Sequence, residues 1–310
     1  MSDAFRIFPP VVGKSLRRTR AAAFKYQLEG LSFVGPAVVF FVIFGFYPLF
    51  HAFRLSFQRW NILGDPVFVG VQNYRFILQR GSQFLQAMGV TVQFIVLFIA
   101  SIIVLAFLFA NLLNRPLPFK TALRAAYFMP YVSSWVVVSI IWLYIFHPSY
   151  GPTASIAQWL GVPPVRWLQE SSLALPSIAL VAVWKELGFY MIIFLAGLQE
   201  IPQMYYDCAE MDGASETRKM FSITIPLMRR TILFAAVIST INSFQMFIPS
   251  YVMTQGGPSD STRVAVLLIY ETGFEHLRMG RAAAMAAVLF ACILALSLLQ
   301  FKVLKGGADQ

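Results

Sequence analysis

The sequence predicts an all-α integral membrane protein, and two observations carry this prediction: its composition and the length of its apolar runs. Of the 310 residues, 58% are hydrophobic and only 12% are charged, whereas a soluble domain usually carries about 25% charged residues. The mean hydropathy is +0.68. The apolar residues gather in runs that are long enough for membrane helices, each of which needs about 20 residues. We expect a single transmembrane domain over residues 31–304.

Six apolar runs have the length of a transmembrane helix. Their expected bounds are Leu31–Phe53, Ala87–Leu112, Ala125–Phe146, Leu173–Leu198, Thr231–Met253 and Ala282–Val303. A basic stretch precedes the first run, as in a signal peptide. This run is too long for the apolar region of such a peptide and lacks a small-residue cleavage site, so we expect a retained helix.

Lysine and arginine orient the six helices, because these residues concentrate on the cytoplasmic side of membrane proteins. The larger set is Arg6, Lys14, Arg17, Arg18, Arg20, Lys25, Arg115, Lys120, Arg124, Arg218, Lys219, Arg229, Arg230, Lys302 and Lys305. The smaller set is Arg54, Arg59, Arg75, Arg80, Arg166, Arg263, Arg278 and Arg281. We therefore expect two cytoplasmic tails, residues 1–30 and 305–310. Orientation and contact with anionic lipids explain the net charge of +10, so we expect no nucleic-acid partner.

The sequence carries no pattern of a metal site, a disulfide framework or a nucleotide site. Its two cysteines form no CxxC motif, and its three histidines are scattered. The tripeptide GKS occurs at residues 13–15, but Phe8 stands where a P-loop requires its first glycine. We therefore expect no cofactor in this chain and no ATPase activity of its own.

A compact polar segment, at about residues 199–230, separates the fourth and fifth apolar runs. Its central stretch, Tyr205–Pro226, reads YYDCAEMDGASETRKMFSITIP. Tyr205–Met211 contains no helix breaker, and Gly213 can adopt the positive φ that ends a helix. Ser215 is a suitable N-cap for a second helix. We predict a helix, a glycine turn and a second helix at the cytoplasmic face, either as a knob that enters a groove on a partner or as a solvated loop.

The polar segment resembles the EAA loop of the membrane subunits of ABC importers, whose pattern is E-A-A-x-x-D-G-A, then an aromatic residue, then I-x-L-P. Asp207 stands at the position of the glutamate and is one methylene shorter. Met220 stands where an aromatic residue is common, and Phe221 follows one place later. The matching residues are Cys208 and Ala209 at the two alanines, then Asp212, Gly213, Ala214, Ile223, Ile225 and Pro226.

In this family the EAA loop is a coupling helix, which docks into a cleft on a cytoplasmic ATPase. ATP-driven closure of the ATPase pair then reaches the membrane helices as a rigid-body motion. The resemblance therefore implies ATPase coupling by Asp207, Ala209, Glu210, Asp212, Gly213 and Ala214. Asp207, Asp212 and Gly213 are the residues expected to decide docking and the shape of the loop.

Segments along almost the whole chain resemble carbohydrate-type permeases, the group of the maltose and glycerol-3-phosphate permeases. They are FVGVQNYRFIL, YFMPYVSSWVVVSIIWLYIFHPSYG, VAVWKELGFYMIIFLAGLQEIP, TQGGPSDST and MGRAAAMAAVLF, in this order. The resemblance implies a multi-pass subunit in a prokaryotic plasma (inner) membrane, which forms half of the path for a sugar or glycerol-phosphate type solute by alternating access. It also implies three partners: ATPase subunits that bind ATP and Mg, a second permease, and an extracytoplasmic solute-binding protein.

Polar and aromatic residues within two apolar runs predict the solute path, because polar residues in a membrane are costly and face a cavity or a partner helix. The residues, spaced for one face of each helix, are Ser239, Asn242, Ser243 and Met246 in the fifth run and Glu186, Phe189 and Tyr190 in the fourth. Hydroxyl and amide groups exchange hydrogen bonds with a polyol, and aromatic rings lie against a sugar. The alternative is hydrogen bonding between helices.

Three other classes of protein are alternatives. A secondary transporter for a small polar solute would need coupling-ion sites and usually internal repeats, and it leaves the polar segment unexplained. A membrane enzyme would need a cluster of His, Asp or Glu, which the sequence does not offer. A permease for amino acids or metals is disfavoured by the segments that resemble carbohydrate permeases.

Overall fold

The computed structural model describes residues 20–116 and 118–305, and it is mainly helical. The predicted tails, residues 1–30 and 305–310, lie mostly outside these described residues, as does the GKS tripeptide. The chain divides into two units, Met1–Ala52 and Phe53–Gln310, and each unit is described by itself. In the first unit, α1 (Arg20–Phe41) continues through a π-helical turn, η1 (Val42–Phe46), into α2 (Tyr47–Leu55), and the boundary between the two units falls within α2.

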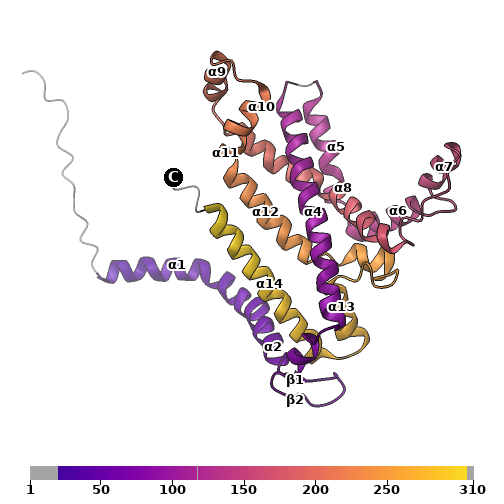
Figure 1. Cartoon of the computed structure of the whole chain (residues 1–310). Coiled ribbons are helices and arrows are strands. Elements are labelled where there is room, and N and C mark those ends of the chain that lie inside the picture. The colour runs from indigo at the N-terminus through magenta and orange to yellow at the C-terminus, as the bar shows by residue number, and fades with distance from the viewer. Residues whose placement is uncertain (1–19, 117, 306–310) are drawn as a thin grey trace, which may run out of the picture. The chain divides into compact units, whose positions relative to one another are not determined.

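The second unit holds a short β-hairpin followed by helices (Figure 1). Its elements are β1 (Gln58–Arg59), β2 (Val67–Phe68), α3 (Gln72–Ile77), α4 (Gln83–Asn114), α5 (Lys120–Val132), α6 (Trp135–Ile145), α7 (Pro152–Trp159), α8 (Ser171–Gln199), α9 (Met204–Met211), α10 (Glu216–Lys219), η2 (Met220–Thr224), α11 (Ile225–Leu227), α12 (Arg229–Phe244), η3 (Ser250–Thr254), α13 (Ala265–Tyr270), η4 (Glu271–Glu275) and α14 (Met279–Lys305). The two strands pair antiparallel, with Gln58 opposite Phe68. Helices α9 and α10 and the connection between α4 and α5 lie at one end of this unit, and the hairpin lies at the other.

Between four and six segments of the described residues are long and apolar enough to cross a membrane. Four are continuous helices: Gly30–Leu55, Gln83–Asn114, Ser171–Gln199 and Met279–Lys302. The other two are pairs of helices that qualify only if each bent pair is one span. α5 and α6 meet at 97°, and Glu216–Leu227 meets α12 at 69°.

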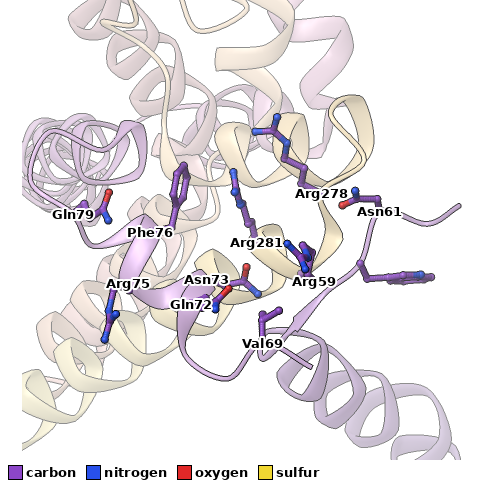
Figure 2. Close-up of a pocket in the computed structure, with 12 residues that line it drawn as sticks. Arg59, Asn61, Val69, Gln72, Asn73, Arg75, Phe76, Gln79, Arg278 and Arg281 are labelled. Carbon is purple, nitrogen blue, oxygen red and sulfur yellow. The ribbon is translucent and has the colours of Figure 1, made fainter. Parts of the chain in front are cut away.

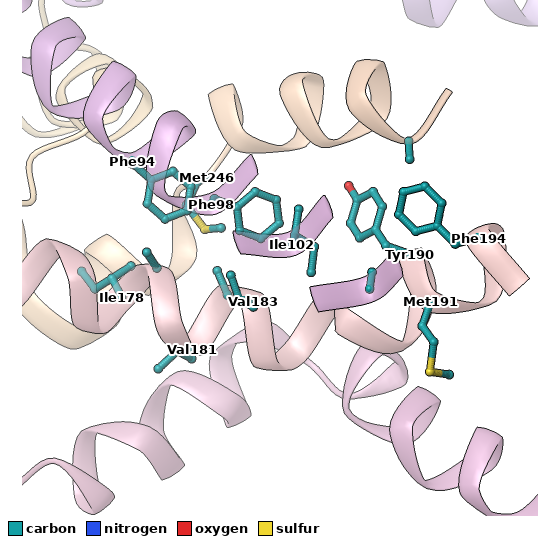
Figure 3. Packing of buried hydrophobic residues seen from close by; sticks show 14 of the residues in the cluster. Phe94, Phe98, Ile102, Ile178, Val181, Val183, Tyr190, Met191, Phe194 and Met246 are labelled. Atoms are coloured by element: carbon teal, nitrogen blue, oxygen red, sulfur yellow. The ribbon is translucent and has the colours of Figure 1, made fainter. Parts of the chain in front are cut away.

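The main core forms where α4 packs along α8. On α4 the buried side chains recur at every fourth position, which keeps them on one face of the helix: Phe94, Phe98, Ile102, Ala106 and Ala110. Figure 3 shows Phe98 and Ile102 of α4 on the side of Tyr190 of α8, and Phe94 of α4 on the side of Ile178. In the apolar window of α8, 67% of the residues are buried, against 28% in α4. Helix α8 is therefore the central helix of this unit, in contact with α4, α5 and α12.

The close approach of α5 to α8 depends on Gly188. A Cβ atom at this position would lie 2.1 Å from the carbonyl oxygen of Tyr127 and 2.7 Å from the Cα atom of Phe128. Both are backbone atoms of α5, so a larger residue would push the two helices apart. Small residues at helix contacts allow such close packing within membranes.

The third apolar run is broken, where the sequence predicts one helix over Ala125–Phe146. Helix α5 ends at Val132, and Ser133 and Ser134 are extended before α6 begins. Pro130, within the last turn of α5, has no N–H to donate to that turn. The run stays apolar on both sides of the break, so hydropathy alone gives no sign of it.

The fifth apolar run is also shorter than predicted. The sequence predicts a helix over Thr231–Met253, but α12 ends at Phe244 and the π-helical turn η3 follows it. The break covers residues 245–247, and Pro249 lies in the first turn of the helical segment that follows, where it has no N–H to donate to the preceding turn. The second, fourth and sixth runs are single helices, as predicted, with ends within a few residues of the expected bounds.

We expect Gly188→Ala to lower the thermal stability of the detergent-purified protein, because the new methyl group overlaps the backbone of α5. Overpacking of this kind typically costs about 1–3 kcal/mol. Gly89→Ala is the matched control, since Gly89 lies within α4 and no heavy atom lies within 4 Å of the position that a Cβ atom would take there. Equal midpoints of thermal unfolding for the two variants would contradict the close approach.

Candidate functional site

Helix α9 ends in a glycine turn of the predicted kind. Gly213 has a φ of +71°, which an L-residue with a side chain rarely adopts. The N–H of Ala214 donates to the carbonyl of Ala209, and the N–H of Gly213 donates to the carbonyl of Glu210. These two hydrogen bonds form a Schellman motif, which satisfies the last carbonyl groups of the helix. The predicted helix and glycine turn are therefore present.

The second arm of the polar segment begins at the predicted N-cap. The Oγ atom of Ser215 accepts a hydrogen bond from the N–H of Arg218 at 3.4 Å. Helix α10 then continues through η2 and α11 to the start of α12. The polar segment is thus joined to an apolar helix by an almost uninterrupted helical path, with a bend of 69°.

Lys219 ties the two arms together, a role that our sequence reasoning missed. Its Nζ atom donates to Glu210 of α9 at 2.6 Å and to Glu216 of α10 at 2.8 Å. These carboxylates raise the pKa of the Lys219 amine, and the bond from Lys219 lowers the pKa of the Glu216 carboxyl. A second link joins the hydroxyl groups of Tyr206 and Thr224 at 2.9 Å. The spacing of Glu216 and Lys219, three residues apart, was the only signal in the sequence.

The six predicted coupling residues lie together around the glycine turn. Glu210, Asp212 and Gly213 are exposed, as is Asp207, which accepts a hydrogen bond from Gln203. Ala209 and Ala214 are half-buried. Large apolar side chains also face outward on this polar segment: Met204 is 65% exposed, Met211 81% and Phe221 67%. Apolar side chains exposed among charges are typical of a surface that binds another protein.

A cavity of about 550 Å³ lies where the broken helices meet the middle of α8. Three parts of the chain contribute to it: the break between α5 and α6, helix α8, and the end of α12 with the residues that follow it. Its lining residues are Tyr131, Ser133, Ser134, Trp135, Lys185, Glu186, Asn242, Gln245, Met246, Phe247, Ile248 and Pro249. This volume lies within the range of small-molecule sites.

Lys185 holds the break between α5 and α6. Its buried Nζ atom donates to the carbonyl of Tyr131 at 2.9 Å and lies 4.6 Å from the centre of the Trp135 ring. A carbonyl near the end of a helix needs a donor, and a cation is favoured there by the helix dipole. The amine of Lys185 therefore has a structural partner on each side of the break.

Glu186 presents an unpartnered acceptor at the same cavity. The residue is only 7% exposed, and within the described part of the chain its Oε2 atom accepts no hydrogen bond. Most buried polar atoms have a partner, so an unpaired carboxylate oxygen at a cavity indicates a binding function. The ring of Tyr131, which lines the cavity, stacks on the ring of Phe189 with centres 4.7 Å apart, and Phe189 is not among the lining residues.

The predicted face of the fifth run divides into two groups. Asn242 and Met246 line the cavity, although Met246 lies beyond the end of α12 and not on its face. Ser239 and Ser243 are buried, and their hydroxyl groups donate to carbonyl groups of their own helix. These two serines are not among the lining residues. The Nδ2 atom of Asn242 donates to the buried hydroxyl of Tyr190 at 3.4 Å, which links α12 to α8.

Comparison with known proteins places this chain among transport proteins. The model of a family described as "Binding-protein-dependent transport system inner membrane component" matches residues 102–305. The sn-glycerol-3-phosphate transport system permease protein UgpA of Agrobacterium fabrum is 32% identical, over 87% of this chain and 92% of that protein. The arabinooligosaccharides transport system permease protein AraP of Halalkalibacterium halodurans is 31% identical, over 86% of this chain and 84% of that protein.

Two solved structures share the fold. One is a bacterial ABC transporter involved in the import of the acidic polysaccharide alginate, with a TM-score of 0.82 and 21% identity over 93% of this chain and 99% of that chain. The other is the bacterial alginate ABC transporter in complex with alginate pentasaccharide-bound periplasmic protein, with a TM-score of 0.79 and 22% identity over 91% and 96% of the two chains. At these identities the likeness concerns the fold.

Proposed function

We propose that this chain, which belongs to the family of inner membrane components of binding-protein-dependent transport systems, forms half of the solute path of an ATP-driven importer. The observation that carries the proposal is the polar segment α9–α11. It is exposed, it is shaped by the Gly213 turn and the Lys219 bridge, and it leads directly into α12. A movement of this segment would therefore reach the helix that contributes Asn242 to the cavity.

In the proposed orientation, six spans place both termini and the polar segment in the cytoplasm. The bent pair α5–α6 is the third span, and the fifth span is built on α12. The polar segment and the basic residues Arg115 and Lys120, at the connection of α4 and α5, lie at the same end of the second unit (Figure 1). A basic end is the cytoplasmic end by the distribution rule for lysine and arginine.

The partners follow from the energy source that import requires. Cytoplasmic ATPase subunits would bind the exposed surface of α9 and α10, and these subunits would also bind ATP and Mg. A second, related permease would complete the path, and an extracytoplasmic binding protein would deliver the solute. The names of the relatives support this set, since they include sugar and glycerol-phosphate transport systems.

The cavity at the α5–α6 break favours a sugar as the solute. The Oε2 atom of Glu186 and the side-chain amide of Asn242 offer hydrogen bonds to hydroxyl groups. The amine of Lys185 already donates to the Tyr131 carbonyl, so it is engaged in the fold. Trp135 supplies an aromatic ring on the same wall, which suits the apolar face of a sugar ring.

Affinity purification of the chain from its native membrane in mild detergent tests the proposed function directly. We expect mass spectrometry to identify a P-loop ATPase and a second permease of similar size in the purified sample. An unrelated membrane protein with the same tag is the control for adventitious capture. Recovery of the chain alone or as a homodimer, in several detergents, would favour a secondary transporter.

We expect Gly213→Val to abolish most solute uptake while the amount of folded protein is unchanged. The position has room for a side chain, since no heavy atom lies within 4 Å of the place that a Cβ atom would take. The effect would come from backbone conformation alone, because a left-handed conformation costs an L-residue about 1–2 kcal/mol. Gly213→Asn is the matched control, since asparagine tolerates positive φ and should retain most uptake. Full uptake by the valine variant would contradict a coupling role for the turn.

We expect Asn242→Leu to reduce solute-stimulated ATP hydrolysis by the assembled transporter about tenfold, with a much smaller effect on basal hydrolysis. The reason is that loss of one buried hydrogen-bonding group costs about 1–3 kcal/mol of solute affinity. Asn111→Leu makes the same exchange on α4, away from the lining residues, and serves as the control. Equal loss of basal and stimulated hydrolysis would assign Asn242 to helix packing.

A further inference from the structure

A second cavity, of about 380 Å³, lies between β1, α3 and the first turn of α14 (Figure 2). Its walls are held by specific contacts. The Nδ2 atom of Asn73 donates to the carbonyl groups of Ser56 and Gln58, both at 2.9 Å. Gly280 lets β1 reach α14, because a Cβ atom there would lie 1.8 Å from the carbonyl oxygen of Gln58. These contacts therefore fix the walls of the cavity at this end of the second unit.

Three arginine side chains surround the cavity. Figure 2 shows Arg59 of β1, Arg278 just before α14, and Arg281 in the first turn of α14 around the same opening. The guanidinium carbon of Arg281 lies 3.9 Å from the centre of the Phe76 ring, a cation–π contact that fixes its position. Arg75 also lines the cavity, but its side chain points away from these three.

The arginine cluster consists of Arg59, Arg278 and Arg281, and no carboxylate among the described residues neutralises its positive charge. Among the described residues, the ion pairs join other side chains, and none of the three arginines has a carboxylate partner. Guanidinium groups around one opening repel each other. An anion bound between them is attracted to each of them, and this attraction offsets the repulsion. The planar guanidinium group also matches the geometry of phosphate, to which it donates two parallel hydrogen bonds.

We propose that the arginine cluster binds the phosphate of an anionic phospholipid headgroup. The proposal rests on the proposed function in two respects: α14 crosses the membrane, and the proposed orientation places the cavity at the outer leaflet. Arg278 and Arg281 flank the start of this apolar helix, so they would lie at the depth of the headgroups. Trp60 also lines the cavity, and tryptophan is enriched at that depth.

The surroundings of the cavity favour a lipid over a soluble anion or an acidic protein. Phe68 and Val71, which flank the lining residue Val69 in the sequence, are 74% and 58% exposed. These apolar surfaces suit acyl chains beside a bound headgroup. Under the proposed orientation the cavity faces the outer leaflet, where lysine and arginine are otherwise depleted. Orientation alone therefore does not account for the cluster.

The test is lipid binding by the full-length chain in mixed micelles, measured by native mass spectrometry with phosphatidylglycerol as the probe. Arg59→Gln/Arg278→Gln removes two exposed arginines of the cluster and leaves the Arg281–Phe76 contact in place. We expect this double variant to bind phosphatidylglycerol about thirtyfold more weakly. The reason is that each basic residue near an anionic membrane surface contributes about a fivefold increase in affinity, and the variant lacks two of them. Arg80→Gln/Arg166→Gln removes the same charge from exposed positions outside the cavity and should bind as the unmodified chain does.

Three results would overturn the proposal. The first is equal phosphatidylglycerol binding by the cluster variant and the control variant. The second is equal binding of phosphatidylglycerol and zwitterionic phosphatidylcholine by the unmodified chain. The third is displacement of the lipid by millimolar inorganic phosphate or by an acidic peptide, which would assign the cluster to a free anion or to a protein partner. None of these results depends on whether ATPase subunits co-purify, so the proposed function is tested separately.

Discussion

A helix that breaks inside an apolar core leaves carbonyl groups that need hydrogen-bond donors. Helix α5 ends in this way beside α8, and the buried amine of Lys185 supplies the donor for the Tyr131 carbonyl. Gly188, almost one turn further along α8, lets the backbone of α5 come close enough for this contact. The bond holds the break, and the bend of 97° at the break opens the larger cavity. The proposed solute site thus depends on one contact between a lysine and a backbone carbonyl.

Lys185 and Glu186 are adjacent charged residues on α8, and they have different roles at the cavity. The amine of Lys185 is engaged in holding the fold, whereas the Oε2 atom of its neighbour Glu186 has no partner among the described residues. Asn242, from the end of α12, lies beside the same cavity and contacts Tyr190 of α8. The cavity therefore joins the central helix to the helix that follows the polar segment. A movement of the polar segment would therefore be transmitted through α12 to the groups that we propose bind the solute.

The polar segment holds its shape by different means from the apolar helices. Helix α9 has only eight residues, and helices of that length are marginal in water without caps or tertiary contacts. The Schellman motif at Gly213, the N-cap at Ser215 and the bridge from Lys219 to Glu210 and Glu216 supply those contacts. Because the shape is fixed from within, the outward side chains are free to contact a partner. The arginine cluster at the opposite end of the second unit is built in the same way, with its walls held by Asn73 and Gly280.

The sequence by itself determined the membrane class, most of the apolar helices and the helix–turn–helix of the polar segment. These features depend on local properties: the length of an apolar run, the positive φ of Gly213 and the hydroxyl group of Ser215. Only the tertiary structure decided where the third and fifth runs break, because apolar composition continues across both breaks. It also decided which polar residues line the cavity, and it turned the hydroxyl groups of Ser239 and Ser243 back to their own helix. Helical spacing fixes the face on which a residue lies, but contacts between distant segments decide what that face meets.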